Sequence, residues 1–145
     1  MNQPVHILLV EDNEGDIVLA REALQEGNLL HNLSVARDGE DALRFLRREP
    51  PHEGAATPDL VLLDINLPRI DGKEVLATIK QDPGLKVIPV VMLTTSSSEK
   101  DVHESYANHA NCYITKPVDL DKFMLIVQKI EAFWLSIVKL PSYRN

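Results

Sequence analysis

The stretch that decides the fold is VHILLVEDNEGD, residues 5–16. Its first half, residues 5–10, is a mostly apolar run of strand length. Four carboxylates then follow within six residues, at Glu11, Asp12, Glu14 and Asp16. A turn needs only one Asp or Asn, and carboxylates this close repel one another unless water, a lysine or a metal ion lies among them. The stretch therefore predicts a strand that ends in a charged site.

The rest of the chain alternates between strand-like and helix-like patterns. Short apolar runs predict further strands at 33–36, 59–63, 87–93 and 112–115. Several strands are continuously apolar, which is typical of strands covered on both faces. Helical spacing of apolar residues follows each strand, beginning at Ile17, Ala42, Val75, Val102 and Phe123, with Ser98 and Asp119 as candidate N-caps. The alternation predicts an α/β fold with a doubly wound, five-stranded parallel sheet.

Length and composition limit the class of protein. The chain has 145 residues, so we expect one domain, 1–145, with an extended C-terminal helix and a short tail. A net charge of −7 argues against a surface that binds nucleic acid or an anionic membrane. Cys112 is the single cysteine, so no intramolecular disulfide can form. We find neither a signal peptide nor a membrane span, and we expect a cytoplasmic protein.

Polar side chains stand where the predicted strands end. Glu11 and Asp12 follow the first strand, and three further residues end the third, fourth and fifth strands: Asp64, Thr94 and Lys116. Ligands of doubly wound sheets bind at the carboxyl ends of the strands, so we expect these side chains to converge. Three carboxylates suit Mg²⁺, and an Asp carboxylate can attack phosphorus to form an aspartyl-phosphate. A hydroxyl and an ammonium would stabilise the transferred group, so the pattern predicts phosphoryl transfer to Asp64.

Several residues of these strand ends have a simpler interpretation when taken alone. Glu11 and Asp12 can cap the following helix and interact with its dipole. Lys116 before Pro117 is typical of a surface turn, and Tyr113 is typical of an aromatic core residue. The expected convergence at the strand ends favours the phosphoryl-transfer interpretation over these alternatives.

Four segments together resemble the signatures of the response-regulator receiver domain. They are VEDNEGD (10–16), DLVLLDINLPRIDG (59–72), VVMLTTS (90–96) and YITKP (113–117). The resemblance covers nearly the whole chain, residues 5–138, and the four motifs are specific only in combination. It implies a flavodoxin-like fold with five βα units and the strand order 2-1-3-4-5.

The resemblance also implies a role for each matching residue. Asp64 would accept a phosphoryl group from a histidine kinase. Glu11 and Asp12 would hold Mg²⁺ together with Asp64 and the backbone carbonyl of Asn66. The chain would be a two-component phosphorylation switch that changes a protein–protein surface, and not an enzyme with a separate substrate.

Further residues would surround the phosphoryl group. Thr94 would donate a hydrogen bond and move inward, Lys116 would form an ion pair, and Tyr113 would turn inward behind Thr94. Thr95 stands where many relatives carry Ala, and its larger side chain leaves the rate of dephosphorylation open. The peptide bond between Lys116 and Pro117 would be cis.

The last predicted helix carries more apolar surface than docking on a sheet requires. Besides its main stripe, Leu120, Met124 and Leu135 form a second row. A partner surface would include four residues near the end of the chain: Phe133, Trp134, Leu140 and Pro141. We expect a homodimer through the fourth helix, fifth strand and fifth helix, and the alternative is a tail that folds back on its own domain. This tail resembles that of single-domain receivers paired with cyanobacterial phytochrome-type histidine kinases.

Two other functions compete with the receiver interpretation. Phosphatases of the haloacid-dehalogenase type carry a D-x-D pattern whose second Asp is a general acid. Here the corresponding residues are Asp64-Ile65-Asn66, and the amide of Asn66 cannot give up a proton in that role. A flavin-binding module needs a loop rich in Ser, Thr and Gly after the first strand, where this chain has EDNEGD. Turnover of a phosphomonoester would favour the first alternative, and a yellow purified protein the second.

Overall fold

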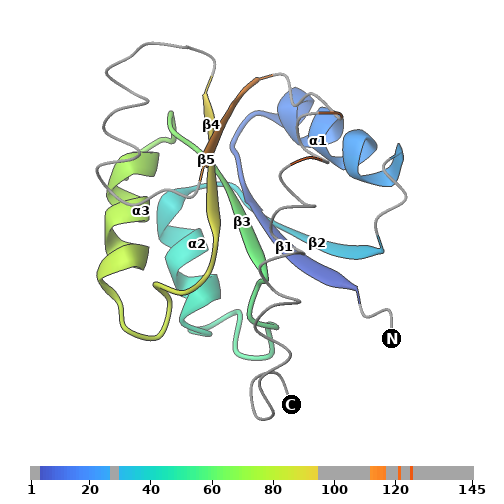
Figure 1. Ribbon diagram of the computed structural model, residues 1–145. Helices are drawn as coiled ribbons and strands as arrows, with labels where there is room; N and C mark the ends of the chain where they lie inside the picture. The colour runs from blue at the N-terminus through green and yellow to red at the C-terminus, as the bar shows by residue number, and fades with distance from the viewer. Residues whose placement is uncertain (1–3, 27–29, 95–111, 117–120, 122–124, 126–145) are drawn as a thin grey trace.

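The computed structural model describes residues 4–26, 30–94, 112–116, 121 and 125. Within these residues the chain forms a central sheet with helices packed on its two faces (Figure 1). The strands are β1 (Val5–Val10), β2 (His31–Ala36), β3 (Leu60–Asp64), β4 (Val90–Thr94) and β5 (Cys112–Thr115). Among the described residues, the helices are α1 (Glu14–Glu26), α2 (Gly39–Leu46) and α3 (Gly72–Gln81). The predicted α/β alternation is confirmed for these elements.

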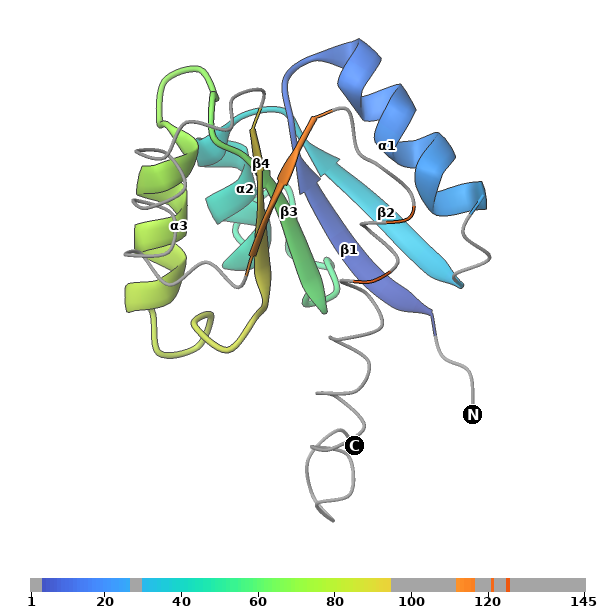
Figure 2. The same cartoon turned by 45° about the horizontal axis from the view of Figure 1, so that its top comes forward.

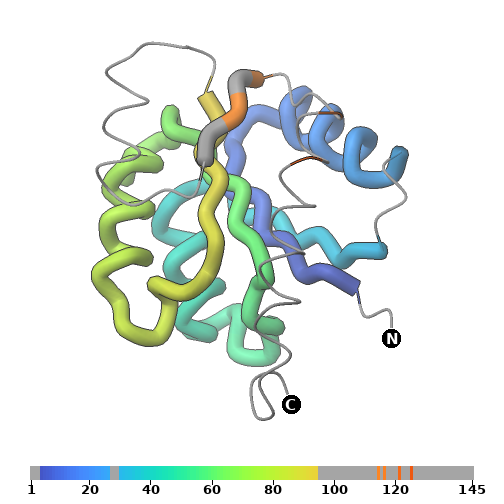
Figure 3. Tube along the Cα trace, in the orientation of Figure 1, coloured from blue at the N-terminus to red at the C-terminus, as the bar shows by residue number. Residues whose placement is uncertain are grey.

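The sheet is parallel throughout, and its strand order is β2-β1-β3-β4-β5. In the trace of Figure 3, β3 runs between β1 and β4. The chain moves from β1 outward to β2 and then returns past β1 to form β3, so the strand order reverses between β1 and β3. Ligands of doubly wound sheets bind at such a reversal. The predicted fold class and strand order are therefore confirmed, and the carboxyl ends of β1 and β3 are the expected place for a site.

Side chains of the strands alternate between two apolar cores. Leu8 and Val61 belong to the core that α2 and α3 cover. Leu9 and Leu62 belong to the core that α1 covers. Figure 2 shows α1 on one face of the sheet and α2 and α3 on the other. Because both faces are covered, every residue of β3 and β4 is buried, as their continuously apolar sequences predict.

Polar caps fix the starts of the helices at the carboxyl edge of the sheet. The Asn13 side chain accepts a hydrogen bond from the backbone N–H of Asp16 at 3.0 Å, in the first turn of α1. Asp38 and Asp71 are the N-caps of α2 and α3. Each cap satisfies an amide that has no partner within its helix. The loops that follow β1, β2 and β3 are thereby held in place next to the strand ends.

Three strands begin at other residues than the sequence predicts. β3 differs by one residue, since it begins at Leu60 rather than Asp59. β2 begins at His31 rather than Leu33, because its first two residues pair in register with the first two residues of β1. β4 begins at Val90 rather than Val87. Pro89 has no amide hydrogen to donate to a sheet ladder, so the strand starts only after it.

Other predictions concern parts of the chain that lie outside the described residues. These are the fourth and fifth helices with their candidate caps Ser98 and Asp119, and the peptide bond into Pro117. Among the residues that are described, no helix combines the length and the apolar character that crossing a membrane would require.

Gly72 packs directly against the end of β3. A Cβ atom at this position would lie 2.1 Å from the carbonyl oxygen of Asp64 and 2.8 Å from Cα of Ile65. We expect Gly72→Ala to lower the free energy of unfolding by about 1–3 kcal/mol, because a clash with backbone atoms cannot be relieved by a side-chain rotation. Urea denaturation measures this change. Gly54→Ala is the matched control, since a Cβ atom there would meet nothing within 4 Å, and equal losses in the two variants would contradict the interpretation.

Candidate functional site

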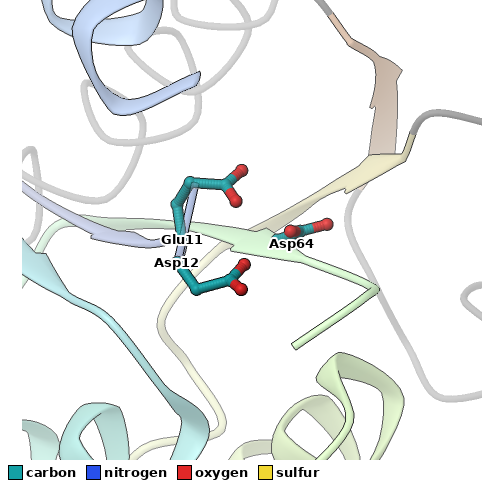
Figure 4. A group of neighbouring side chains, drawn as sticks. All are labelled: Glu11, Asp12 and Asp64. Carbon is teal, nitrogen blue, oxygen red and sulfur yellow. The ribbon is translucent and has the colours of Figure 1, made fainter. Parts of the chain in front are cut away.

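Three carboxylates gather at the carboxyl ends of β1 and β3. Glu11 and Asp12 follow β1 directly, and Asp64 is the last residue of β3. Figure 4 shows the three side chains at this edge, and one oxygen of each lies within 4.8 Å of the others. Glu11 and Asp64 are buried, whereas Asp12 is exposed to solvent. The parallel pairing of β1 with β3 brings these groups together, because both strands end at the same edge of the sheet.

Lys116 adds a positive charge to the three carboxylates. Its Nζ donates hydrogen bonds to Glu11 Oε1 at 2.7 Å, to Asp16 Oδ2 at 2.9 Å and to Asp64 Oδ2 at 3.2 Å. The Lys116 side chain is only 8% exposed. Its backbone is also held, since the N–H of Lys116 donates to the carbonyl oxygen of Thr94 at 2.6 Å. A lysine therefore offsets the repulsion that the EDNEGD segment would otherwise produce.

Burial and hydrogen bonding shift the pKa values of two of these groups. Loss of hydration is the main cause that raises the pKa of Glu11 to about 7; the nearby Asp64 adds to the rise, and the hydrogen bond from Lys116 opposes it. Burial by itself would lower the pKa of Lys116, but hydrogen bonds to Glu11 and Asp16 and the charge of Asp64 raise it above its ordinary value. Lys116 is therefore charged at neutral pH, and Glu11 gains or loses its proton close to neutrality.

Backbone amides hold the two buried carboxylates from the other side. The N–H of Asn13 donates to Glu11 Oε2 at 3.2 Å, and the N–H of Asn66 donates to Asp64 Oδ1 at 3.1 Å. Glu11 and Asp64 thus each have one oxygen on a backbone amide and the other on Lys116. Neither carboxylate can rotate without losing a hydrogen bond, so the site is ordered before any ligand binds.

The structure brings four of the predicted site residues together and places two more near them. Glu11, Asp12, Asp64 and Lys116 meet at one edge, and Thr94 is buried at the end of β4. Asn66 lies in the loop after β3 and is exposed. The predicted roles of a further set cannot be compared with the structure, because these groups lie outside its described part: Thr95, the side chain of Tyr113, Phe133, Trp134, Leu140 and Pro141.

Two residues at this edge were assigned no role from the sequence. Asp16 lies in the first turn of α1 and accepts a hydrogen bond from Lys116. Arg37, which follows β2, forms an ion pair with Glu14 in the same turn of α1. The signal for Asp16 was the excess of acid in EDNEGD, but only the structure shows that its carboxylate reaches Lys116. No motif in the sequence indicated the pair between Arg37 and Glu14.

The arrangement is suited to two kinds of chemistry. Carboxylate oxygens from Glu11, Asp12 and Asp64 are hard ligands of the kind that a small divalent cation prefers. The Asp64 carboxylate can also act as a nucleophile, and the ammonium of Lys116 lies where negative charge would be added.

Comparison with known proteins identifies the family that the four sequence motifs resemble. The response regulator receiver domain family matches residues 7–128 of the chain. The chain is 50% identical over 141 residues to the response regulator Rcp1 of Synechocystis, covering 97% of this chain and 96% of that protein.

Solved structures extend this similarity to the fold. The phosphorylated cyanobacterial phytochrome response regulator RcpA is 51% identical, with a TM-score of 0.78 over 97% of this chain and 100% of that chain. The Mn²⁺-bound form of Rcp1 is 50% identical, with a TM-score of 0.76 over 96% of this chain and 100% of that chain. A divalent-metal site in this chain is supported by two observations. Rcp1, which is 50% identical, has been solved with Mn²⁺ bound, and the carboxylates of Glu11, Asp12 and Asp64 gather at one place here.

A chain that matches the family from residue 7 to residue 128, and that is half identical to a response regulator over nearly its whole length, belongs to the response regulator receiver domains, the phosphorelay regulators of two-component systems.

Proposed function

We propose that Asp64 accepts a phosphoryl group from a histidine kinase and that phosphorylation changes the surface that the chain offers to other proteins. The position of Asp64 supports this most strongly. It is a buried carboxylate at the strand-order reversal, hydrogen-bonded to the ammonium of Lys116 and grouped with two further carboxylates. A carboxylate in such surroundings has a cationic partner ready for the charge that a phosphoryl group adds.

In the transfer, a carboxylate oxygen of Asp64 attacks the phosphorus of a phosphohistidine on the kinase. An O–P bond forms, and the N–P bond breaks with its electron pair returning to the histidine nitrogen. Lys116 would form an ion pair with the phosphoryl oxygens, and Thr94 would donate its hydroxyl hydrogen to one of them. Tyr113 would turn inward behind Thr94, and the side chain of Thr95 would affect the rate of dephosphorylation. Hydrolysis then releases phosphate and restores the Asp64 carboxylate.

Mg²⁺ is the cation that we assign to the acidic cluster. Glu11, Asp12 and Asp64 fit it because their oxygens approach one another within 4.8 Å, and the backbone carbonyl of Asn66 would be a further ligand. When bound, the cation would neutralise negative charge on the transferring oxygens. Because a protonated carboxyl is a poor ligand, binding requires Glu11 to be ionised.

The kinase in this proposal is of the phytochrome type. Support comes from the 51% identity to RcpA, a phytochrome response regulator, over 97% of this chain. That coverage extends beyond the region matched by the family, 7–128, and so includes much of the C-terminal segment. The chain would act in the cytoplasm as a phosphoacceptor, catalysing only its own phosphorylation and dephosphorylation.

The output in this proposal is a homodimer through the fourth helix, β5 and the fifth helix. Support comes from the sequence alone, where apolar residues broaden the last predicted helix beyond a single stripe. The partner surface would include Phe133, Trp134, Leu140 and Pro141.

Asp64→Asn should abolish phosphorylation, because an amide is not a competent nucleophile toward phosphorus. Intact mass, measured after incubation with acetyl phosphate and Mg²⁺, should rise by one phosphoryl group in the unchanged chain and not in the variant. Asp59→Asn is the matched control: Asp59 stands just before the amino end of β3, remote from the site, and accepts a hydrogen bond from the N–H of His6. That variant should be phosphorylated normally.

An adduct that persists in Asp64→Asn would move the acceptor to another residue. A phytochrome-type kinase that has phosphorylated itself serves as a second donor, beside a chemotaxis-type kinase. Equal transfer from the two kinases would remove the phytochrome part of the proposal and leave the acceptor role of Asp64 intact.

Mg²⁺ affinity should rise with pH through neutrality. Burial raises the pKa of Glu11 to about 7, so at pH 6 most molecules must lose a proton before they bind the cation. Calorimetric titration should therefore give an affinity about tenfold higher at pH 8 than at pH 6. Glu11→Gln should bind weakly at each pH, whereas Asp12→Asn should bind more weakly but keep the pH dependence. A pH-independent affinity in the unchanged chain would contradict the role of Glu11.

Sedimentation equilibrium should give twice the chain mass of 16.3 kDa. Trp134→Ala should shift the equilibrium toward the monomer, because truncating a large aromatic at an interface removes much of its buried area. A monomeric mass for the unchanged chain, with and without beryllofluoride as a phosphoryl analogue, would refute the homodimer.

A further inference from the structure

Lys116 has three carboxylate partners, and they have different fates in the proposed reaction. Glu11, Asp16 and Asp64 each accept one hydrogen bond from its Nζ. An ammonium has three hydrogens, so these contacts use all of its donors. The question is which partner keeps Lys116 in place when the site is loaded.

Glu11 and Asp64 would both change partners when the site is loaded. Each has one oxygen on a backbone amide and the other on Lys116. A cation in the acidic cluster needs an oxygen of each, and a phosphoryl group then occupies Asp64. Two of the three contacts of Lys116 would therefore be replaced during the reaction.

Asp16 lies apart from these changes. It does not belong to the cluster of carboxylates whose oxygens meet within 4.8 Å, which consists of Glu11, Asp12 and Asp64. It sits in the first turn of α1, where its own N–H is capped by Asn13, and its Oδ2 lies 2.9 Å from Lys116 Nζ. The contact joins the end of β5 to α1, across 100 residues of sequence.

We propose that Asp16 is a positioning residue for phosphorylation, which holds the ammonium of Lys116 beside Asp64 through every step in which Glu11 and Asp64 exchange partners. The proposal rests on the acceptor role of Asp64. Lysine is a flexible four-carbon chain, so an ammonium without a fixed partner spends its time in many rotamers. One hydrogen bond to Asp16 leaves two N–H groups for the phosphoryl oxygens.

A simpler alternative is that Asp16 only adds negative charge near the start of α1. Glu14 separates the two explanations, because it lies in the same first turn and carries the same charge. Its carboxylate forms an ion pair with Arg37, and it is 66% exposed. Glu14→Gln therefore removes the same charge as Asp16→Asn without touching Lys116.

The test has two readouts, of which only the first requires phosphorylation. Asp16→Asn should slow phosphorylation by acetyl phosphate about tenfold, the effect of weakening one charged hydrogen bond. Combined with Lys116→Met, the same substitution should have no further effect. In the resting chain, amine acetylation read by peptide mass spectrometry should label Lys116 faster in Asp16→Asn than in the unchanged chain. Glu14→Gln should match the unchanged chain in rate and labelling.

Three results would overturn the proposal. They are equal slowing by Asp16→Asn and Glu14→Gln, an unchanged phosphorylation rate in Asp16→Asn, and an undiminished effect of that substitution when Lys116 is already Met. An unchanged chain that forms no adduct would refute the acceptor role of Asp64 instead. In that case the labelling of Lys116 would still decide whether Asp16 anchors it.

Discussion

A lysine ammonium among buried carboxylates is the interaction on which the site depends. Without Lys116, Glu11 and Asp64 would lie side by side in a dry environment, where each would favour protonation of the other. Lys116 follows β5, whereas Asp64 ends β3, two strands away or about 10 Å in a sheet. Only a long cationic side chain spans that gap, so β5 must be paired correctly before the acidic edge is neutralised.

The sheet makes this interaction possible because it holds the ends of β1, β3 and β5 at fixed positions relative to one another. β3 and β4 are buried on both faces, and each of their apolar residues belongs to one of the two cores. A shift of one residue in register would exchange the two sets of side chains, so the apolar pattern fixes which residue stands at each strand end. Gly72 then seats α3 against the carbonyl of Asp64, which leaves the acceptor little room to move.

The sequence predicts those contacts of the site that follow from the order of the strands. Glu11, Asp64 and Lys116 stand directly at strand ends, so alternation and the strand-end rule were enough to bring them together. Asp16 lies on a helix, and its contact depends on the rotation of α1 over the sheet, which no local pattern encodes. The predicted start of β4 is wrong for a different reason. The apolar run begins at Val87, but Pro89 has no N–H with which to join the hydrogen-bond ladder of the sheet.

The raised pKa of Glu11 also shows that the site lowers the stability of the folded chain. Its pKa is raised to about 7 in the folded chain from an ordinary value of 4.5, so folding favours its protonated form. The stabilising contribution of that form is complete below pH 4.5 and is lost as pH rises through 7. At higher pH the ionised carboxylate depends on the positive charge beside it. Lys116 supplies that charge in the resting chain, and a bound divalent cation would add to it. Transfer of Glu11 from Lys116 to a bound cation would keep the buried carboxylate neutralised, so the site could load without first exposing it to water.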